Sequence, residues 1–160
     1  MKAEPQKEHH WLDKLVGEWT YETEAAMAPG EEPSKFKGTE SVRSLGGLWV
    51  VAEGGGEMPG GGVARTLMTL GYDERKGHYV GSWVGSMMTH MWVYRGSLDA
   101  TGNVLTLDTE GPDFSAEGKT LRYQDVIAFT SDDRRTLTAR MLGDNGEWRE
   151  FMQAHYRRNK

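Results

Sequence analysis

Short turn-forming segments divide most of the chain into about ten runs of strand-forming residues, and this spacing limits the possible folds more than any other feature. Residues 99–103 (DATGN) and 144–146 (DNG) are the clearest hairpin signals, because Asp, Asn and Gly accept the backbone angles of tight turns. The predicted strands cover residues 18–27, 34–45, 48–54, 64–73, 77–87, 90–99, 103–110, 119–130, 134–143 and 147–158.

Connections this short join antiparallel neighbours, so a meander is the simplest topology for these strands. Ten strands in a meander would curl and close into a barrel, which removes the exposed sheet edges. The sequence therefore predicts an all-β fold, an antiparallel β-barrel of about ten strands, with a two-sheet sandwich as the alternative. The glycine-rich segment 54–62 (GGGEMPGGG) is expected to form a flexible hairpin at the barrel mouth, where it could act as a lid.

One helix is predicted, near the N-terminus. Within residues 8–19 (EHHWLDKLVGEW), Leu12, Leu15 and Val16 recur at helical spacing, and Gly17 is placed to end the helix. We therefore expect a helix over about 8–16 and a barrel over about 17–158. A chain of 160 residues is long enough for one substantial core, so a single domain over 1–160 is expected.

Composition and charge exclude several classes of partner. The 24 acidic and 19 basic residues are well mixed along the chain and give a net charge of −5, which argues against nucleic acid as a partner. The first ten residues are polar and the apolar runs are short, so neither a secretory signal nor a membrane partner is expected. The sequence has no cysteine, which removes disulfides and thiolate chemistry; a cytoplasmic location is expected.

The tripeptide 17–19 (GEW) opens the first predicted strand directly after the helix. This arrangement resembles the Gly-x-Trp signature of the lipocalin and calycin superfamily. In that superfamily the tryptophan closes one end of the barrel, and an arginine from a late strand packs on it. The resemblance implies a contact between Trp19 and either Arg157 or Arg158.

A closer resemblance covers residues 8 to 158. The blocks GTESVRSLGGLWVVAEG, TLMTLGYD, VGSWVGSMMTHMWVY, LTLDTEGPDF, YQDVIAF and EFMQAHYRR are similar to an uncharacterised bacterial domain-of-unknown-function family, usually described as lipocalin-like. The resemblance implies a lipocalin-like (calycin-like) barrel. It implies no activity and no functional residues.

Aromatic side chains gather on two neighbouring predicted strands. Residues i and i+2 share a face of a strand, so His90, Trp92 and Tyr94 lie together on one strand. Tyr79 and Trp83 share a face of the preceding strand, with glycines between and beyond them. If both faces point inward, they form an aromatic wall with one imidazole, which is typical of a small-molecule site.

Charged side chains also occur at positions where half-buried residues are expected. They are Glu40, Arg43, Glu53, Asp125 and Arg140. Asp125 is the clearest, because it shares a face with Tyr123 and other apolar residues. A buried carboxylate is costly unless it is paired, so these residues either pair with one another or with His90, or bind a ligand. Glu40 and Glu53 have a second interpretation, on the wet outer surface of the barrel.

The sequence favours binding of a small hydrophobic or aromatic molecule in the barrel interior. The candidate ligand-binding residues are Trp83, His90, Trp92, Tyr94, Glu40, Glu53, Tyr123, Asp125 and Arg140. No cofactor is required by this interpretation, although a haem held through His90 or His155 is a special case of it.

Acid–base catalysis in the same cavity is the alternative. His90 and Asp125 would be base and orienting group in an isomerase, cyclase or hydratase type of reaction. Tyr94 or Tyr123 would be the donor, and Arg43 or Arg140 would stabilise an anion. A metal held by His90 and carboxylates needs the fold to bring them together, because metal-binding spacing is missing from the sequence. A homodimer through an outer barrel face also stays open, and the sequence does not decide whether the protein is an enzyme.

Overall fold

The computed structural model describes residues 2–26, 28–58 and 60–160. Met1, Met27 and Pro59 lie outside the described residues; Met27 is the last residue of the first predicted strand, and Pro59 belongs to the glycine-rich segment. The ordered elements are α1 (Lys7–Leu12), the 3-10 helix η1 (Asp13–Leu15), β1 (Gly17–Ala25), β2 (Ser34–Leu45), β3 (Trp49–Glu57), β4 (Val63–Asp73), β5 (His78–Gly85), β6 (Trp92–Leu98), β7 (Val104–Pro112), β8 (Thr120–Ser131), β9 (Arg134–Leu142) and β10 (Trp148–Arg158).

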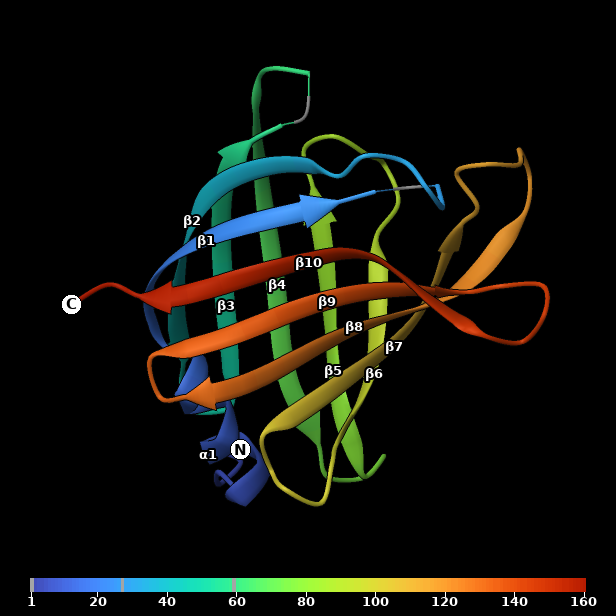
Figure 1. Ribbon diagram of the computed structural model, residues 1–160. Helices are drawn as coiled ribbons and strands as arrows, with labels where there is room; N and C mark the ends of the chain where they lie inside the picture. The colour runs from blue at the N-terminus through green and yellow to red at the C-terminus, as the bar shows by residue number, and fades with distance from the viewer. Residues whose placement is uncertain (1, 27, 59) are drawn as a thin grey trace.

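The ten strands form a closed antiparallel barrel (Figure 1). Each strand pairs with its neighbours in sequence, and β1 closes the ring by pairing with β10, with Trp19 opposite Arg158 in the register. The predicted ten-stranded barrel with a short N-terminal helix is therefore confirmed, and the sandwich alternative is excluded. None of the helices among the described residues has the length and apolar character needed to cross a membrane.

The α1 helix lies against one end of the barrel, and five hairpin connections surround the opposite end (Figure 1). The helix is held there by its polar groups as well as its apolar face. The Trp11 Nε1–H donates to the Gly102 carbonyl oxygen over 2.6 Å, and the Tyr79 hydroxyl donates to the Glu8 carbonyl oxygen over 3.0 Å. Leu12 and Leu15 are buried beneath the barrel, so this end is closed.

Trp19 is fully buried beside two arginines. The Arg158 guanidinium lies 4.2 Å from the Trp19 ring centroid, and the Arg135 guanidinium lies 4.5 Å from it. The implied arginine partner is therefore Arg158, whereas Arg157 points to solvent. Gly17 occupies a position that favours glycine, because its φ is +138° and a Cβ there would lie 2.5 Å from Arg158 Nη1.

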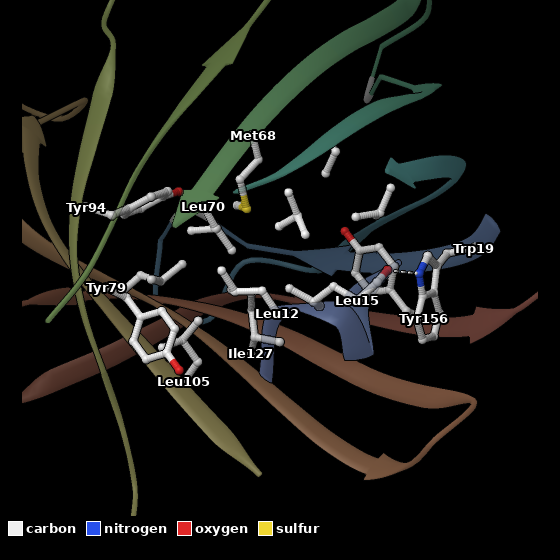
Figure 2. Close-up of a cluster of buried hydrophobic side chains, with 14 of the residues drawn as sticks. Leu12, Leu15, Trp19, Met68, Leu70, Tyr79, Tyr94, Leu105, Ile127 and Tyr156 are labelled. Atoms are coloured by element: carbon white, nitrogen blue, oxygen red, sulfur yellow. Dashed lines mark hydrogen bonds between the residues drawn. The ribbon is translucent and has the colours of Figure 1, made fainter. Parts of the chain in front are cut away.

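The barrel interior is filled at the α1 end and hollow toward the other. Inward-facing side chains alternate along each strand, so position along a strand sets depth. Leu70, Leu105 and Ile127 pack with Leu12 near the helix, as Figure 2 shows. Further along the same strands, the inward positions are larger aromatic or polar residues, and the packing opens into a cavity.

The Arg158 guanidinium joins the helical segment to the β8–β9 hairpin. Its Nη2 donates to the carbonyl oxygens of Lys14 (2.8 Å) and Asp132 (3.0 Å), and its Nη1 donates to that of Val16.

We predict that Arg158→Lys lowers the free energy of unfolding by about 2 kcal/mol, because an ammonium cannot reach three carbonyls in this fork geometry. Urea denaturation measures the change. Arg157→Lys is the matched control, and equal effects of the two substitutions would contradict the prediction.

Candidate functional site

A cavity of about 510 Å³ occupies the half of the barrel away from α1. Strands β4 to β10 supply most of its walls, and the β5–β6 and β7–β8 connections contribute Met88 and Phe114 at the mouth. The lining is apolar, with a few polar side chains at the inner end. This volume is within the range of small-molecule sites, which run from roughly 300 to 1,000 Å³.

Two aromatic rings that line the cavity have their polar atoms already hydrogen-bonded within the protein. Trp92 Nε1–H donates to the Met88 sulfur over 3.1 Å, and the Tyr123 hydroxyl donates to the Pro112 carbonyl oxygen over 2.6 Å. The Trp92 and Tyr123 rings meet edge to face with centroids 5.0 Å apart. A Cβ at Gly111 would overlap the Trp92 ring, so this glycine lets the indole lie close to β7.

A hydrogen-bonded carboxylate lies at the inner end of the cavity. The Tyr94 hydroxyl donates to Asp125 Oδ2 over 2.5 Å. Burial raises the pKa of Asp125 from 3.8 to about 6, against the smaller lowering effect of the Tyr94 hydrogen bond. Burial also raises the pKa of Tyr94 well above 10, and the neighbouring Asp125 charge raises it further. At neutral pH the pair is therefore an ionised carboxylate and a protonated phenol.

Thr109 adds an unpartnered hydroxyl to the same cavity. Its side chain lines the wall on β7, the residue is 7% exposed, and its Oγ1 has no hydrogen-bond partner among the described residues. An unsatisfied buried hydroxyl is uncommon, because it forgoes about 1–3 kcal/mol of solvation. Asp125, Tyr94 and Thr109 are thus the polar groups that the cavity offers to a molecule inside it.

The structure brings five of the nine predicted ligand-binding residues together. Trp83, Trp92, Tyr94, Tyr123 and Asp125 all line the cavity. They come from three strands, β5, β6 and β8, whose inward faces follow the predicted alternation.

His90 lies outside this group. Strand β6 begins at Trp92, so His90 precedes it and lines an outer groove with His78 and Arg95. The β6–β7 ladder ends at the Arg95–Asp108 pair, and beyond it His90 Nε2 donates to the Glu110 carbonyl oxygen over 3.0 Å. The imidazole therefore bridges the two strands where their ladder stops.

This placement corrects the expected pairing of His90 with Asp125. His155 also faces outward, on the exposed side of β10, so neither histidine lines the cavity. The described residues contain no group of three His, Asp or Glu side chains that could hold a metal ion.

Glu53 and Arg140 lie on the outer surface. For Glu53 this agrees with its second interpretation, and for Arg140 it corrects the expected place in the cavity. Glu53 Oε1 is 3.5 Å from Arg43 Nη1, and both side chains are exposed. Arg140 Nε donates to Gln124 Oε1 over 2.8 Å on the outer face of β8 and β9. Alternation divides the residues of a strand between two faces but does not show which face points inward. Both faces of β3 carry apolar side chains, so the sequence did not determine on which side of the barrel wall Glu53 lies.

Glu40 lies inside the barrel but deeper than the cavity. Its Oε1 accepts from Arg135 Nη2 over 2.6 Å, and the Arg135 guanidinium lies 3.9 Å from the Tyr156 ring centroid. A separate void of about 20 Å³ adjoins this pair, enough for about one water molecule. The partner of Glu40 is thus Arg135 and not Arg43, Arg140 or His90, the partners that the sequence suggests. Arg135 shares a strand face with Leu137 and Ala139, whereas Arg134 is on the other face, and this alternation is the signal that indicates it.

Several cavity residues were missed although the sequence carries a signal for them. Leu137 and Ala139 line the cavity from β9 at the i, i+2 spacing of one strand face. Thr109 continues the inward face of Leu107 on β7. Applying the alternation to every strand would have found them. The mouth residues Met88 and Phe114 lie in connections, where no periodicity indicates direction.

Fold and site together define a class of protein: a closed ten-stranded antiparallel barrel with an aromatic-lined interior cavity and one buried carboxylate. The chain belongs to the family described as "Protein of unknown function (DUF1579)", whose family model matches residues 4–158. The predicted family membership is therefore confirmed. No curated protein matches the sequence at a significant level.

A solved structure from a bacterium shows the same fold at low sequence identity. Rv2717c from M. tuberculosis is similar with a TM-score of 0.68 and 14% identity, covering 98% of this chain and 100% of that one. A redesigned β-barrel, b11L5F_LGL, gives a TM-score of 0.49 at 9% identity, over 92% of this chain and 94% of its own. EF1p2_mFAP2b bound to DFHBI gives 0.46 at 11% identity, over 95% and 99%.

The raised pKa of Asp125 predicts a particular pH dependence of stability. The unfolded carboxyl ionises near 3.8 and the folded one near 6, so between these values the folded protein holds a proton that the unfolded chain has lost. The free energy of unfolding therefore falls by about 3 kcal/mol from this group as pH rises through the window. Between pH 4 and pH 7, the free energy of unfolding of Asp125→Asn should therefore rise by about 3 kcal/mol relative to that of the wild type.

Urea denaturation of both proteins at pH 4, 5, 6 and 7 measures this difference, and other titrating groups cancel in the comparison. Tyr94→Phe provides a second check. It removes a hydrogen bond that lowers the pKa of Asp125, so the pH range over which the wild-type stability falls should extend to higher pH. A difference between Asp125→Asn and the wild type that does not vary with pH would contradict the prediction.

Proposed function

We propose that this protein binds a small hydrophobic or aromatic molecule inside the barrel. The cavity of about 510 Å³ is the observation that carries the proposal, because its walls are aromatic and aliphatic and its polar groups gather at one end. Such a site buries the apolar body of a ligand and uses a few polar groups to orient it. Burial of apolar area contributes roughly 25 cal/mol per Å², which makes an aromatic molecule a favourable occupant.

The mouth of the cavity supports the same proposal. Phe114 lines the cavity from the β7–β8 connection and is 55% exposed. Met88 lines the cavity from the β5–β6 connection. A molecule in the mouth would bury these apolar side chains, which otherwise face water. Both belong to hairpin connections at the end of the barrel opposite α1, where a ligand can enter without opening the sheet (Figure 1).

Acid–base catalysis on a bound molecule is the second candidate function, and the Asp125–Tyr94 pair favours it. A carboxyl with a pKa of about 6 can exchange a proton near neutral pH, and a tyrosine that stays protonated can donate a hydrogen bond beside it. Mass spectrometry of a molecule recovered after incubation separates the two functions. A binding protein returns it unchanged, whereas a catalyst returns a product that Asp125→Asn does not form.

Fluorescence of N-phenyl-1-naphthylamine, a neutral dye that brightens in apolar surroundings, tests the binding proposal. We expect saturable enhancement with the wild type and at least about tenfold weaker binding to Ala139→Phe, because the new ring occupies the cavity. Ala128→Phe is the matched control, since Ala128 lies on the outer face of the adjacent strand β8. Both variants need a barrel-like circular dichroism spectrum. Equal binding by the two variants, or no binding by the wild type, would contradict the proposal.

A further inference from the structure

We propose that the cavity selects molecules that carry a protonated amine on an aromatic or aliphatic body, with the ammonium bound to Asp125. This inference rests on the proposed function and names the ligand class for the same cavity. Three features support it: Asp125 has one carboxylate oxygen without a hydrogen-bond partner among the described residues, no cationic side chain lines the described part of the cavity, and aromatic rings border the cavity.

The first feature is the hydrogen bonding of the carboxylate. Tyr94 occupies Asp125 Oδ2, and Oδ1 has no partner among the described residues. Asp125 is half-buried because it faces the cavity, so Oδ1 is accessible to a molecule there. Thr109 Oγ1, unpartnered and buried, lines the same space. A carboxylate oxygen accepts but cannot donate, so the complementary ligand group is a donor.

The second feature is the missing counter-charge. The cavity-lining residues that the structure describes include no Lys, Arg or His. The residues opposite Asp125 on β7 and β9 are Leu107 and Ala139. The other titratable groups near it are phenols: Tyr94 from β6, Tyr123 on its own strand and Tyr156 from β10, whose pKa the Asp125 charge helps to raise.

Arg135, a buried cation of the interior, faces the separate void and is paired. Its guanidinium bonds Glu40 over 2.6 Å and stacks on Tyr156. Burial alone raises the pKa of Asp125, the Tyr94 hydrogen bond lowers it, and no charged group is among the causes of the shift. The Asp125 carboxylate is thus a half-buried negative charge that faces the cavity and has no ion-pair partner in the described part of the chain.

The third feature is the aromatic wall. Trp83, Trp92 and Tyr123 border the cavity that contains Asp125. A cation near the face of such rings is attracted by their negative electrostatic potential. The same rings bury the apolar body of the ligand, so a single molecule with an ammonium at one end and a ring at the other uses both parts of the lining.

An ammonium is favoured over a neutral donor because folding has already removed water from the carboxylate. A cation entering the cavity adds only its own desolvation and gains a charge-assisted hydrogen bond. An anion of the same shape loses its hydration and meets a like charge, so it should be excluded. The order of affinity expected from this charge pattern is therefore amine, then alcohol, then carboxylate.

Isothermal titration calorimetry with three naphthalene compounds of similar size tests this order at pH 7.5. The probes are 1-naphthylmethylamine, 1-naphthalenemethanol and 1-naphthoate. We expect the amine to bind the wild type roughly 10- to 100-fold more tightly than the alcohol, and the carboxylate to bind most weakly. Asp125→Asn should abolish the advantage of the amine while the alcohol still binds. Asp108→Asn removes the same charge from the outer face of β7 and should retain the advantage.

A pH comparison on the wild type provides a test that does not depend on any variant folding. At pH 5 an alkylamine remains protonated, whereas Asp125, with its pKa of about 6, is mostly neutral. The advantage of amine over alcohol should therefore fall by about tenfold between pH 7.5 and pH 5. An advantage that is constant with pH overturns the assignment of Asp125 as the ammonium site.

The outcomes separate this inference from the proposed function. If the alcohol binds and the amine binds no more tightly, the ligand class is overturned and cavity binding stands. If the advantage of the amine persists in Asp125→Asn, the ammonium binds elsewhere and the inference is overturned. If none of the three compounds binds, cavity binding itself is contradicted, and the inference fails with it.

Discussion

Pairing of β1 with β10 is the constraint on which the rest of the structure depends. It turns a meander with two open edges into a ring, and only a ring has an inside. The pairing places Trp19 beside Arg158, whose guanidinium also bonds the carbonyl oxygens of Lys14, Val16 and Asp132. One side chain thus joins the first strand, the helical segment before it and the β8–β9 hairpin, so closure of the barrel and closure of its α1 end are coupled.

Closure divides the interior into two parts with different physical roles. Near α1, leucine and isoleucine side chains fill the space and contribute to stability. Toward the other end, glycines stand beside large rings, as Gly111 does beside Trp92, and the packing leaves a cavity. The polar groups of the interior follow this division. Glu40 and Arg135 neutralise each other at depth, whereas Asp125 has a phenol for a partner and an oxygen left over.

This unbalanced carboxylate gives the cavity its chemical character. Its cost is greatest when the cavity is dry and the pH is above about 6, because the charge then has neither water nor a cation beside it. A protein that retains such a group at the inner end of an apolar cavity lowers its own stability at neutral pH. The ammonium that we propose as the ligand group would offset that cost, and the proposal thereby connects the stability of the barrel to ligand binding.

Much of the fold follows from the sequence, because local signals determined it. Turn chemistry at 99–103 and 144–146 set the hairpins, and the period of two along each strand placed Trp92, Tyr94, Tyr123 and Asp125 on shared faces. Such signals act between residues a few positions apart, so a single sequence carries them. They were sufficient for the ten strands, the helix and about half of the predicted site.

Tertiary structure decided what depends on registers between strands distant in sequence. Glu53 lies on the surface because its side of β3 faces outward. Glu40 pairs with Arg135 of β9, which is 95 residues away in the sequence. His90 lies outside the cavity because β6 begins at Trp92, two residues later than the sequence pattern predicts. These outcomes depend on closure of the ring, which fixes parity and depth for all strands at once. The sequence determined which residues could share a face, and only the closed barrel decided which faces meet.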